Sequence, residues 1–200
     1  MSGARAKTSG VVLMVAMVWF IGAVVAGYLR WLEPAPRVVN QIVLVGLTVT
    51  LLVAFWKVGS FREWVLSLPM RVMILFHVVR FVGFYFLILY RRGELPFAFA
   101  VPGGVGDILV ATTALVVAGL LMNNPFAGRV VLAWNLLGAI DILLVVISAA
   151  RFGLADPGSM VALTRLPLSL LPTFIVPLII FSHAMIFYRL SRSRGVPVWV

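Results

Sequence analysis

The sequence predicts an all-α membrane protein, a polytopic bundle of six transmembrane helices. Of its 200 residues, 63% are hydrophobic and only 11% are charged, whereas soluble proteins average about 45–50% and about 25%. The hydrophobic residues form six runs of the length that crosses a bilayer, roughly 20 residues. These runs lack the alternation of period two that is typical of membrane β-barrels. Composition, run length and periodicity together favour membrane-spanning helices.

The six runs predict one transmembrane domain that covers residues 1–200. Prolines, glycines and charged residues separate them, and the predicted spans are about 11–29, 38–56, 71–90, 105–123, 130–150 and 169–189. The first run follows Arg5 and Lys7, as the apolar part of a signal peptide would. It is longer than that part usually is, and no small-residue cleavage site follows it, which favours an uncleaved helix.

Basic residues outside the spans predict the orientation. Nine lie on the side of the N-terminus: Arg5, Lys7, Lys57, Arg62, Arg71, Arg129, Arg189, Arg192 and Arg194. Six lie on the other side: Arg30, Arg37, Arg91, Arg92, Arg151 and Arg165. Because cytoplasmic loops carry the excess of Lys and Arg, we expect both termini in the cytoplasm. The same distribution assigns the net charge of +10 to membrane anchoring and not to nucleic-acid binding.

Three connections between the spans have distinctive sequences. Residues 57–70 mix charged and aromatic residues, which is typical of a short segment on the cytoplasmic membrane surface. Residues 91–106 contain three glycines between Gly103 and Gly106 and predict a loop that dips back toward the membrane. Residues 151–168 contain Pro157 and Pro167 and predict a second outer connection.

A few polar residues interrupt the spans, and they are functional candidates because a charge in the bilayer costs about 2.5–3.5 kcal/mol. They are His77, Arg80, Asp107, Asn135, Asp141 and His183. At a rise of about 1.5 Å per residue, His77, Asn135 and His183 lie at one depth, roughly 9 Å from the cytoplasmic boundary. Arg80 and Asp141 lie deeper, at roughly 13 and 18 Å, which predicts an ion pair near the midplane.

These residues have two interpretations. As a binding site on the third, fifth and sixth spans, Arg80 beside Asp141 and Asn135 would hold an anion or a carboxylate. The catalytic candidates in such a site are His77, Arg80, Asp141 and His183, with a histidine as acid or base. As a structural lock, Arg80 and Asp141 would only neutralise each other and fix the helix register. The sequence leaves both interpretations open.

Asp107 follows the residues GGVG at the predicted start of the fourth span. A carboxylate at a helix start accepts free backbone N–H groups and complements the helix dipole. This position favours a helix cap over a catalytic role, and Asp107 becomes a ligand-binding residue where the preceding loop lines a cavity. A short internal similarity pairs it with Asp141, since GVGDIL begins at Gly104 and GAIDIL at Gly138.

The matched depth of His77 and His183 permits one ligand to be shared by the third and sixth spans. Two neutral imidazoles suit the axial positions of a haem iron, or a divalent metal ion together with Asp141 or Asn135. The alternative is that each histidine forms an ordinary hydrogen bond. The chain has no cysteine, which excludes disulfides and iron–sulfur clusters.

Two further positions predict local geometry. Pro177 has no amide N–H for the carbonyl of Thr173, so the sixth span should kink there. Trp134 and Gly138 flank Asn135 on the fifth span, a pattern that predicts a close helix contact with a hydrogen bond across it.

Three strings resemble an uncharacterised family of small six-helix bacterial membrane proteins, over about residues 40–190. They are FHVVRFVGFYFLILYRRGELPFAFAVPGGVGDILVATTALVVA, WNLLGAIDILLVV and PTFIVPLIIFSH. The resemblance implies six helices in a bacterial inner (plasma) membrane and transfers no activity.

The functional hypothesis is a buried polar site that binds a small hydrophobic or anionic ligand or a metal ion, which includes the case of a membrane enzyme. One alternative is a proton-linked transporter with Pro177 and the loop at Gly103–Gly106 as flexible points. Others are a haem-binding electron carrier and an accessory subunit that pairs with a membrane complex or with its own copies. No motif selects among these classes.

Overall fold

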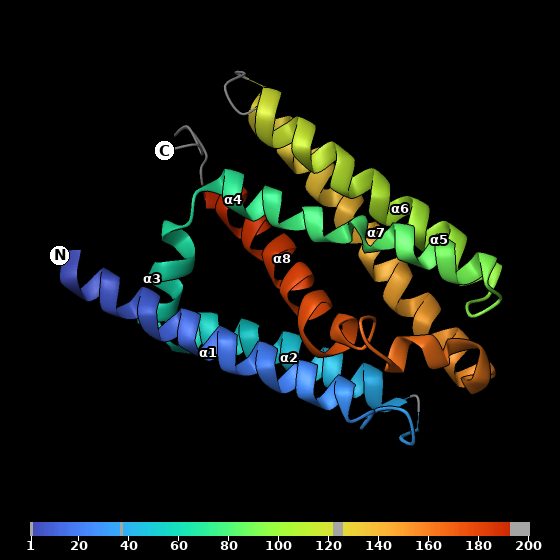
Figure 1. Cartoon of the computed structure of the whole chain (residues 1–200). Helices are drawn as coiled ribbons and strands as arrows, with labels where there is room; N and C mark the ends of the chain where they lie inside the picture. The colour runs from blue at the N-terminus through green and yellow to red at the C-terminus, as the bar shows by residue number, and fades with distance from the viewer. Residues whose placement is uncertain (1, 37, 122–125, 193–200) are drawn as a thin grey trace. The chain divides into compact units, whose positions relative to one another are not determined.

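The computed structural model describes residues 2–36, 38–121 and 126–192, and within these ranges it is helical with no β-strand (Figure 1). The α-helices are α1 (Ser2–Tyr28), α2 (Val38–Lys57), α3 (Gly59–Ser67), α4 (Met70–Leu75), α5 (Gly83–Arg91), α6 (Phe97–Val116), α7 (Ala127–Ala155) and α8 (Val176–Arg192). Tighter 3₁₀ turns form η1 (Phe76–Val82) and η3 (Pro157–Thr164), and wider π turns form η2 (Val117–Leu121) and η4 (Leu171–Ile175). The all-α prediction is confirmed.

Six helical stretches in the described part of the chain are long and apolar enough to cross a membrane. They are Lys7–Tyr28, Val38–Lys57, Met70–Arg91, Phe97–Gly119, Ala127–Ala155 and Leu171–Arg192. Each overlaps one span predicted from the sequence, so the prediction of six long apolar helices is confirmed. The first, fourth and fifth begin earlier than predicted, and the fifth also ends later.

The contacts between residues divide the chain into two compact units. The first is Met1–Leu68 with Val161–Phe181, and the second is Pro69–Met160 with Ser182–Val200. In the first unit, α2 packs against α3 and η4, and α1 contacts the same two elements. The buried ring of Phe55 and the ring of Phe61 both lie against Phe181, with centroids 6.3 and 6.0 Å apart. Aromatic packing thus joins α2, α3 and the start of α8.

The effect of Pro177 on hydrogen bonding is visible in this unit. Pro177 lies next to Val176, where π-helical η4 gives way to α8. The carbonyl of Thr173, which a proline four residues later cannot serve, accepts a hydrogen bond from the indole N–H of Trp19 at 2.8 Å. The Trp19 ring also meets the Phe174 ring edge to face, at 4.8 Å. A side chain of α1 therefore satisfies the backbone group that the proline leaves open.

In the second unit, α4, η1 and α5 form one helical stretch, and α6 runs back along it (Figure 1). The chain reverses at Gly93, whose φ of +73° is a conformation that favours glycine. The amide of Glu94 donates to the carbonyl of Leu89 at 2.9 Å, which closes the end of α5. α7 packs along α6.

The prediction of a loop over residues 91–106 is wrong for residues 97–106. Helix α6 starts at Phe97, directly after Pro96, and includes Pro102 and the glycines that indicated irregular backbone. These glycines serve helix packing. A Cβ added at Gly104 would lie 2.8 Å from the carbonyl oxygen of Gly83, and one at Gly83 would overlap the carbonyl of Gly104. The backbones of α5 and α6 are thus in contact, as small residues allow in membrane helix pairs.

The segment predicted to lie on the membrane surface, residues 57–70, contains helix α3. Its Val65 is buried, and the rings of Phe61 and Trp64 stack with centroids 6.2 Å apart. A short amphipathic helix is therefore present, while its place at a membrane surface stays a prediction. The outer connection predicted over 151–168 is mostly helical, formed by the end of α7 and by η3.

Candidate functional site: a buried polar cluster

The second unit contains all six polar candidates that interrupt the predicted spans. They come from four stretches of chain: η1 (His77, Arg80), α6 (Asp107), α7 (Asn135, Asp141) and α8 (His183). His77 and Arg80 lie in the 3₁₀ turn η1, where side chains three residues apart lie one above the other. The 3₁₀ geometry thus places both residues on the face that meets the other helices.

Arg80 is the charged centre of the cluster and is only 1% exposed. Its Nε donates to a carboxylate oxygen of Asp107 at 2.7 Å, and its Nη2 donates to Asp141. Its Nη1 donates to the backbone carbonyl of Gly138 at 3.0 Å. The ion pair predicted between Arg80 and Asp141 is confirmed, but it is one half of a triad in which two carboxylates share one guanidinium.

The expectation that Asp107 caps a helix is wrong. Asp107 lies ten positions inside α6, which begins at Phe97, and its side chain is only 5% exposed. Its carboxylate pairs with Arg80 instead of with free backbone amides. The prediction failed because it placed the start of the fourth helix at the glycines, where the chain is already helical.

The internal similarity between GVGDIL and GAIDIL has a structural counterpart. Its two aspartates, Asp107 and Asp141, are the two partners of Arg80. The first glycine of each string marks a close contact: Gly104 meets the backbone of Gly83, and a Cβ at Gly138 would lie 2.8 Å from the ring of His183. A Cβ at Gly106 would overlap the carboxylate of Asp141. The same short pattern therefore positions a carboxylate on each of two neighbouring helices.

The two histidines face each other. Their ring centroids are 4.3 Å apart with the planes tilted by 51°, and the side chains are buried, with His77 at 0% and His183 at 2% exposure. The Nε2 atom of His77 lies 2.9 Å from the hydroxyl of Ser182, a contact that the sequence did not predict. The matched depth permitted these two rings to meet, and the structure brings them together.

Asn135 determines which nitrogen of His183 carries the proton. Its Nδ2 donates to the backbone carbonyl of His183 at 3.1 Å, so its Oδ1 is the oxygen that faces the ring. This Oδ1 lies 2.8 Å from Nδ1 of His183. An oxygen only accepts, so Nδ1 is the protonated nitrogen, and Nε2 of the neutral imidazole carries a lone pair.

That lone pair has no hydrogen-bond partner among the described residues, and neither has Nδ1 of His77. The indole ring of Trp134 closes one side of the pair, edge to face with His77 at a centroid distance of 5.1 Å. The Trp134 N–H donates to the carbonyl of Val110 at 3.4 Å, which ties the indole to α6. The close contact predicted around Asn135 and Gly138 is present, and it holds the imidazole of His183 in place.

The distance between the rings limits which groups the pair could hold. Two axial imidazoles on one iron lie on opposite sides of the metal, with ring centroids about 6 Å apart for metal–nitrogen bonds of about 2 Å. At 4.3 Å, the rings fit two adjacent positions of a metal ion and do not fit the two faces of a haem. Within the described residues no group of three or more His, Asp or Glu side chains is arranged around a common metal position.

The sequence thus identified the cluster's charged and imidazole groups and the close contact at Gly138, but it missed Ser182 and the packing roles of Gly83, Gly104 and Gly106. Neither a serine nor a glycine in an apolar helix is distinctive, so only the contacts reveal their roles. Comparison with known proteins finds no match among curated proteins or solved structures. A model of a domain of unknown function (DUF8737) matches residues 37–191. The chain therefore belongs to this uncharacterised family, the DUF8737 family.

Proposed function

We propose that this is a multi-pass protein of the bacterial inner membrane, with both termini in the cytoplasm, and that its buried polar cluster binds a small cation at His77 and His183. The excess of basic residues on the side of the N-terminus supports the orientation. The six apolar helices support the bilayer location. The cluster supports a binding role because buried polar atoms without partners are rare in proteins.

The observation that carries the proposal is the unpartnered Nε2 of His183, whose lone pair Asn135 fixes. A deprotonated imidazole nitrogen is the atom that binds a transition-metal ion, and the Asn135 amide holds the ring in place as metal-binding histidines require. The adjacent ring of His77 presents a second unpartnered nitrogen. Imidazole ligands suit zinc, copper, nickel and iron ions.

The charge around the cluster supports a cation over the anion considered from the sequence. Arg80 contributes one positive charge, and Asp107 and Asp141 together contribute two negative charges when both are ionised. All three guanidinium nitrogens already donate to protein oxygens. The triad therefore has no excess positive charge to attract a carboxylate, and its unbalanced carboxylate favours a nearby cation.

Zinc titration of the detergent-purified protein, prepared without a polyhistidine tag, tests this function. We expect about one zinc ion per chain by calorimetry and elemental analysis. The His183→Ala and His77→Ala variants should lose this binding. The Thr113→Ala variant is the control, because the Thr113 hydroxyl donates to the Leu109 carbonyl of its own helix. Absence of stoichiometric binding by zinc, copper and nickel ions would refute the proposal.

A second candidate function, proton-linked transport, is favoured by the triad. Two carboxylates on one guanidinium leave one negative charge unless a proton is bound. The Asp141 side chain is 22% exposed, so it provides an entry point that Asp107, at 5%, does not. In proteoliposomes under an imposed voltage, Asp141→Asn should reduce proton uptake, whereas Asp156→Asn, at the end of α7, should not. Proton uptake equal to that of empty liposomes counts against this candidate.

A further inference from the structure

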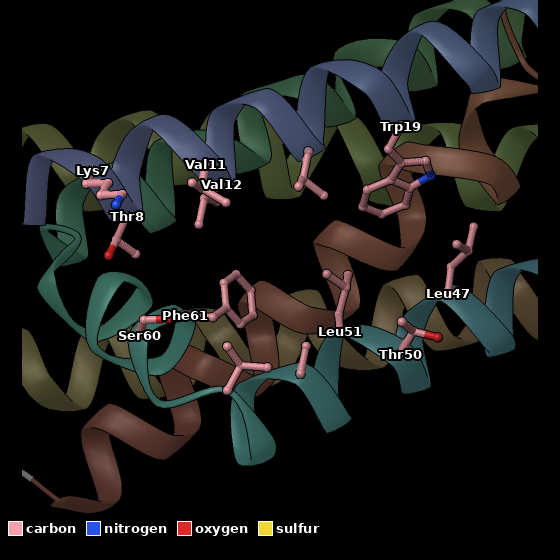
Figure 2. A pocket seen from close by; sticks show the side chains of 13 residues that line it. Lys7, Thr8, Val11, Val12, Trp19, Leu47, Thr50, Leu51, Ser60 and Phe61 are labelled. Carbon is pink, nitrogen blue, oxygen red and sulfur yellow. The ribbon is translucent and has the colours of Figure 1, made fainter. Parts of the chain in front are cut away.

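A pocket of about 750 Å³ lies within the first unit, among α1, α2 and α3 (Figure 2). Its volume falls in the usual range of small-molecule sites, about 300–1,000 Å³. Its lining is formed by Lys7, Thr8, Val11, Val12, Val15, Trp19, Leu47, Thr50, Leu51, Ala54, Val58, Ser60 and Phe61. None of these residues belongs to the polar cluster, so this is a separate site.

The polar side chains of the pocket are concentrated at one end. Figure 2 shows Lys7 and Thr8 on α1 at the same end as Ser60 on α3, with Trp19 at the other end. The stretch between is lined mainly by aliphatic side chains. Thr50 adds little polarity there, because its hydroxyl donates to the Gly46 carbonyl of its own helix at 2.8 Å.

The end of the pocket at Trp19 offers a ligand no free polar group. The Trp19 indole N–H is already hydrogen-bonded to the Thr173 carbonyl, and its ring packs against Phe174. The indole therefore offers the pocket mainly apolar surface. The site is thus amphipathic along its length, with a single charged side chain, the cation Lys7, in its lining.

The length of the pocket suits an extended chain. From Lys7 to Trp19 the helix rises by about 18 Å. The lining between these two ends is mainly aliphatic, so an occupant gains by burying apolar surface along that length. A hydrocarbon chain with a charged group at one end matches this arrangement.

We propose that this pocket binds one acyl chain of an anionic membrane phospholipid, with the lipid phosphate at Lys7. The aliphatic lining receives the chain and the indole of Trp19 meets its end. Lys7 pairs with the headgroup, and none of the described carboxylates forms an ion pair with it. A Lys or Arg at a membrane surface favours anionic over neutral lipids by about fivefold.

Photo-crosslinking in nanodiscs tests the proposal on the full-length chain. Phosphatidylglycerol and phosphatidylcholine, each with a diazirine on the acyl chain, serve as probes, and mass spectrometry locates the labelled residues. We expect phosphatidylglycerol to label pocket residues such as Val12 and Leu51 about fivefold more than phosphatidylcholine does. The Lys7→Gln variant should lose this preference, whereas Lys57→Gln, outside the pocket lining, should keep it.

A second pair of variants separates the pocket from general contact with lipid. Val12→Trp fills the pocket and should abolish labelling of Leu51, while Leu13→Trp, on the exposed face of the same helix, should not. Equal labelling by both lipids would overturn the proposal. So would a Lys7→Gln variant that retains the preference, or labelling of Leu51 that survives Val12→Trp.

Discussion

The side-chain amide of Asn135 on α7 holds His183 on α8 at two points, accepting from the ring and donating to the backbone carbonyl. One side chain thus fixes both the orientation of the imidazole and the nitrogen that carries its proton. Asn135 is buried at 0% exposure, so water does not replace these bonds.

Replacing Asn135 should therefore weaken metal binding without removing a metal ligand. Loss of a group that orients a ligating histidine typically costs 10–100-fold in metal affinity. We expect Asn135→Ala to lower zinc affinity by that factor in calorimetry, whereas His183→Ala abolishes it. Unchanged zinc affinity in Asn135→Ala would show that the amide does not prepare the ring for a metal.

The different burial of the two carboxylates that pair with Arg80 predicts which second substitution restores more stability to an Arg80→Met variant. Arg80→Met leaves buried carboxylates unpaired and should destabilise the protein by about 3–5 kcal/mol. Because Asp107 is more buried than Asp141, Arg80→Met with Asp107→Asn should recover more stability than Arg80→Met with Asp141→Asn. Denaturant unfolding in detergent micelles measures the three free energies. If Asp141→Asn restored more stability than Asp107→Asn, that result would contradict the deeper burial of Asp107.

The contact between the backbones of α5 and α6 predicts that alanine at Gly83 and alanine at Gly103 have different effects on stability. Gly83→Ala would force a Cβ onto the carbonyl of Gly104 and should cost about 1–3 kcal/mol. Gly103→Ala is the matched control, because its Cβ would lie 3.4 Å from a methyl group of Val145, an ordinary contact. Thermal unfolding should separate the two variants. Equal melting temperatures would argue against the close approach of the helices.

Trp19 and Pro177 should be energetically coupled, although they do not form a bond with each other. Trp19→Phe leaves the carbonyl of Thr173 without its indole donor, at a cost of about 1–3 kcal/mol. In the Pro177→Ala background the new amide is available to the same carbonyl, so the cost should fall. A double-mutant cycle measures this coupling, which should be about 1 kcal/mol. A coupling energy of zero is inconsistent with a shared carbonyl.

Much of the architecture was predictable, because the length and composition of membrane spans are direct consequences of bilayer thickness. Counting residues from the span ends also placed His77 at the depth of His183 and predicted the ion pair of Arg80 with Asp141. The helix rise fixes depth in this way, but it gives no rotation about the helix axis. The partners that depend on rotation, such as Ser182 for His77, were therefore missed.

The glycines between positions 103 and 106 explain why the predicted start of the fourth helix was wrong. Glycine and proline usually mark loops in soluble proteins, but membrane helices use glycine to bring backbones together. In this chain Gly104 contacts Gly83, and the helix begins seven residues earlier, at Phe97. The error moved Asp107 from the interior of a helix to its end, and so concealed the second partner of Arg80.

Electron paramagnetic resonance of the copper(II)-loaded protein determines whether His77 and His183 bind one transition-metal ion. We expect one copper ion per chain, coupled to two imidazole nitrogens. Coupling should fall to one nitrogen, or the ion should be lost, in His77→Ala and in His183→Ala. If the protein takes up no copper, or if either variant keeps the spectrum of the unsubstituted protein, His77 and His183 do not bind the ion together.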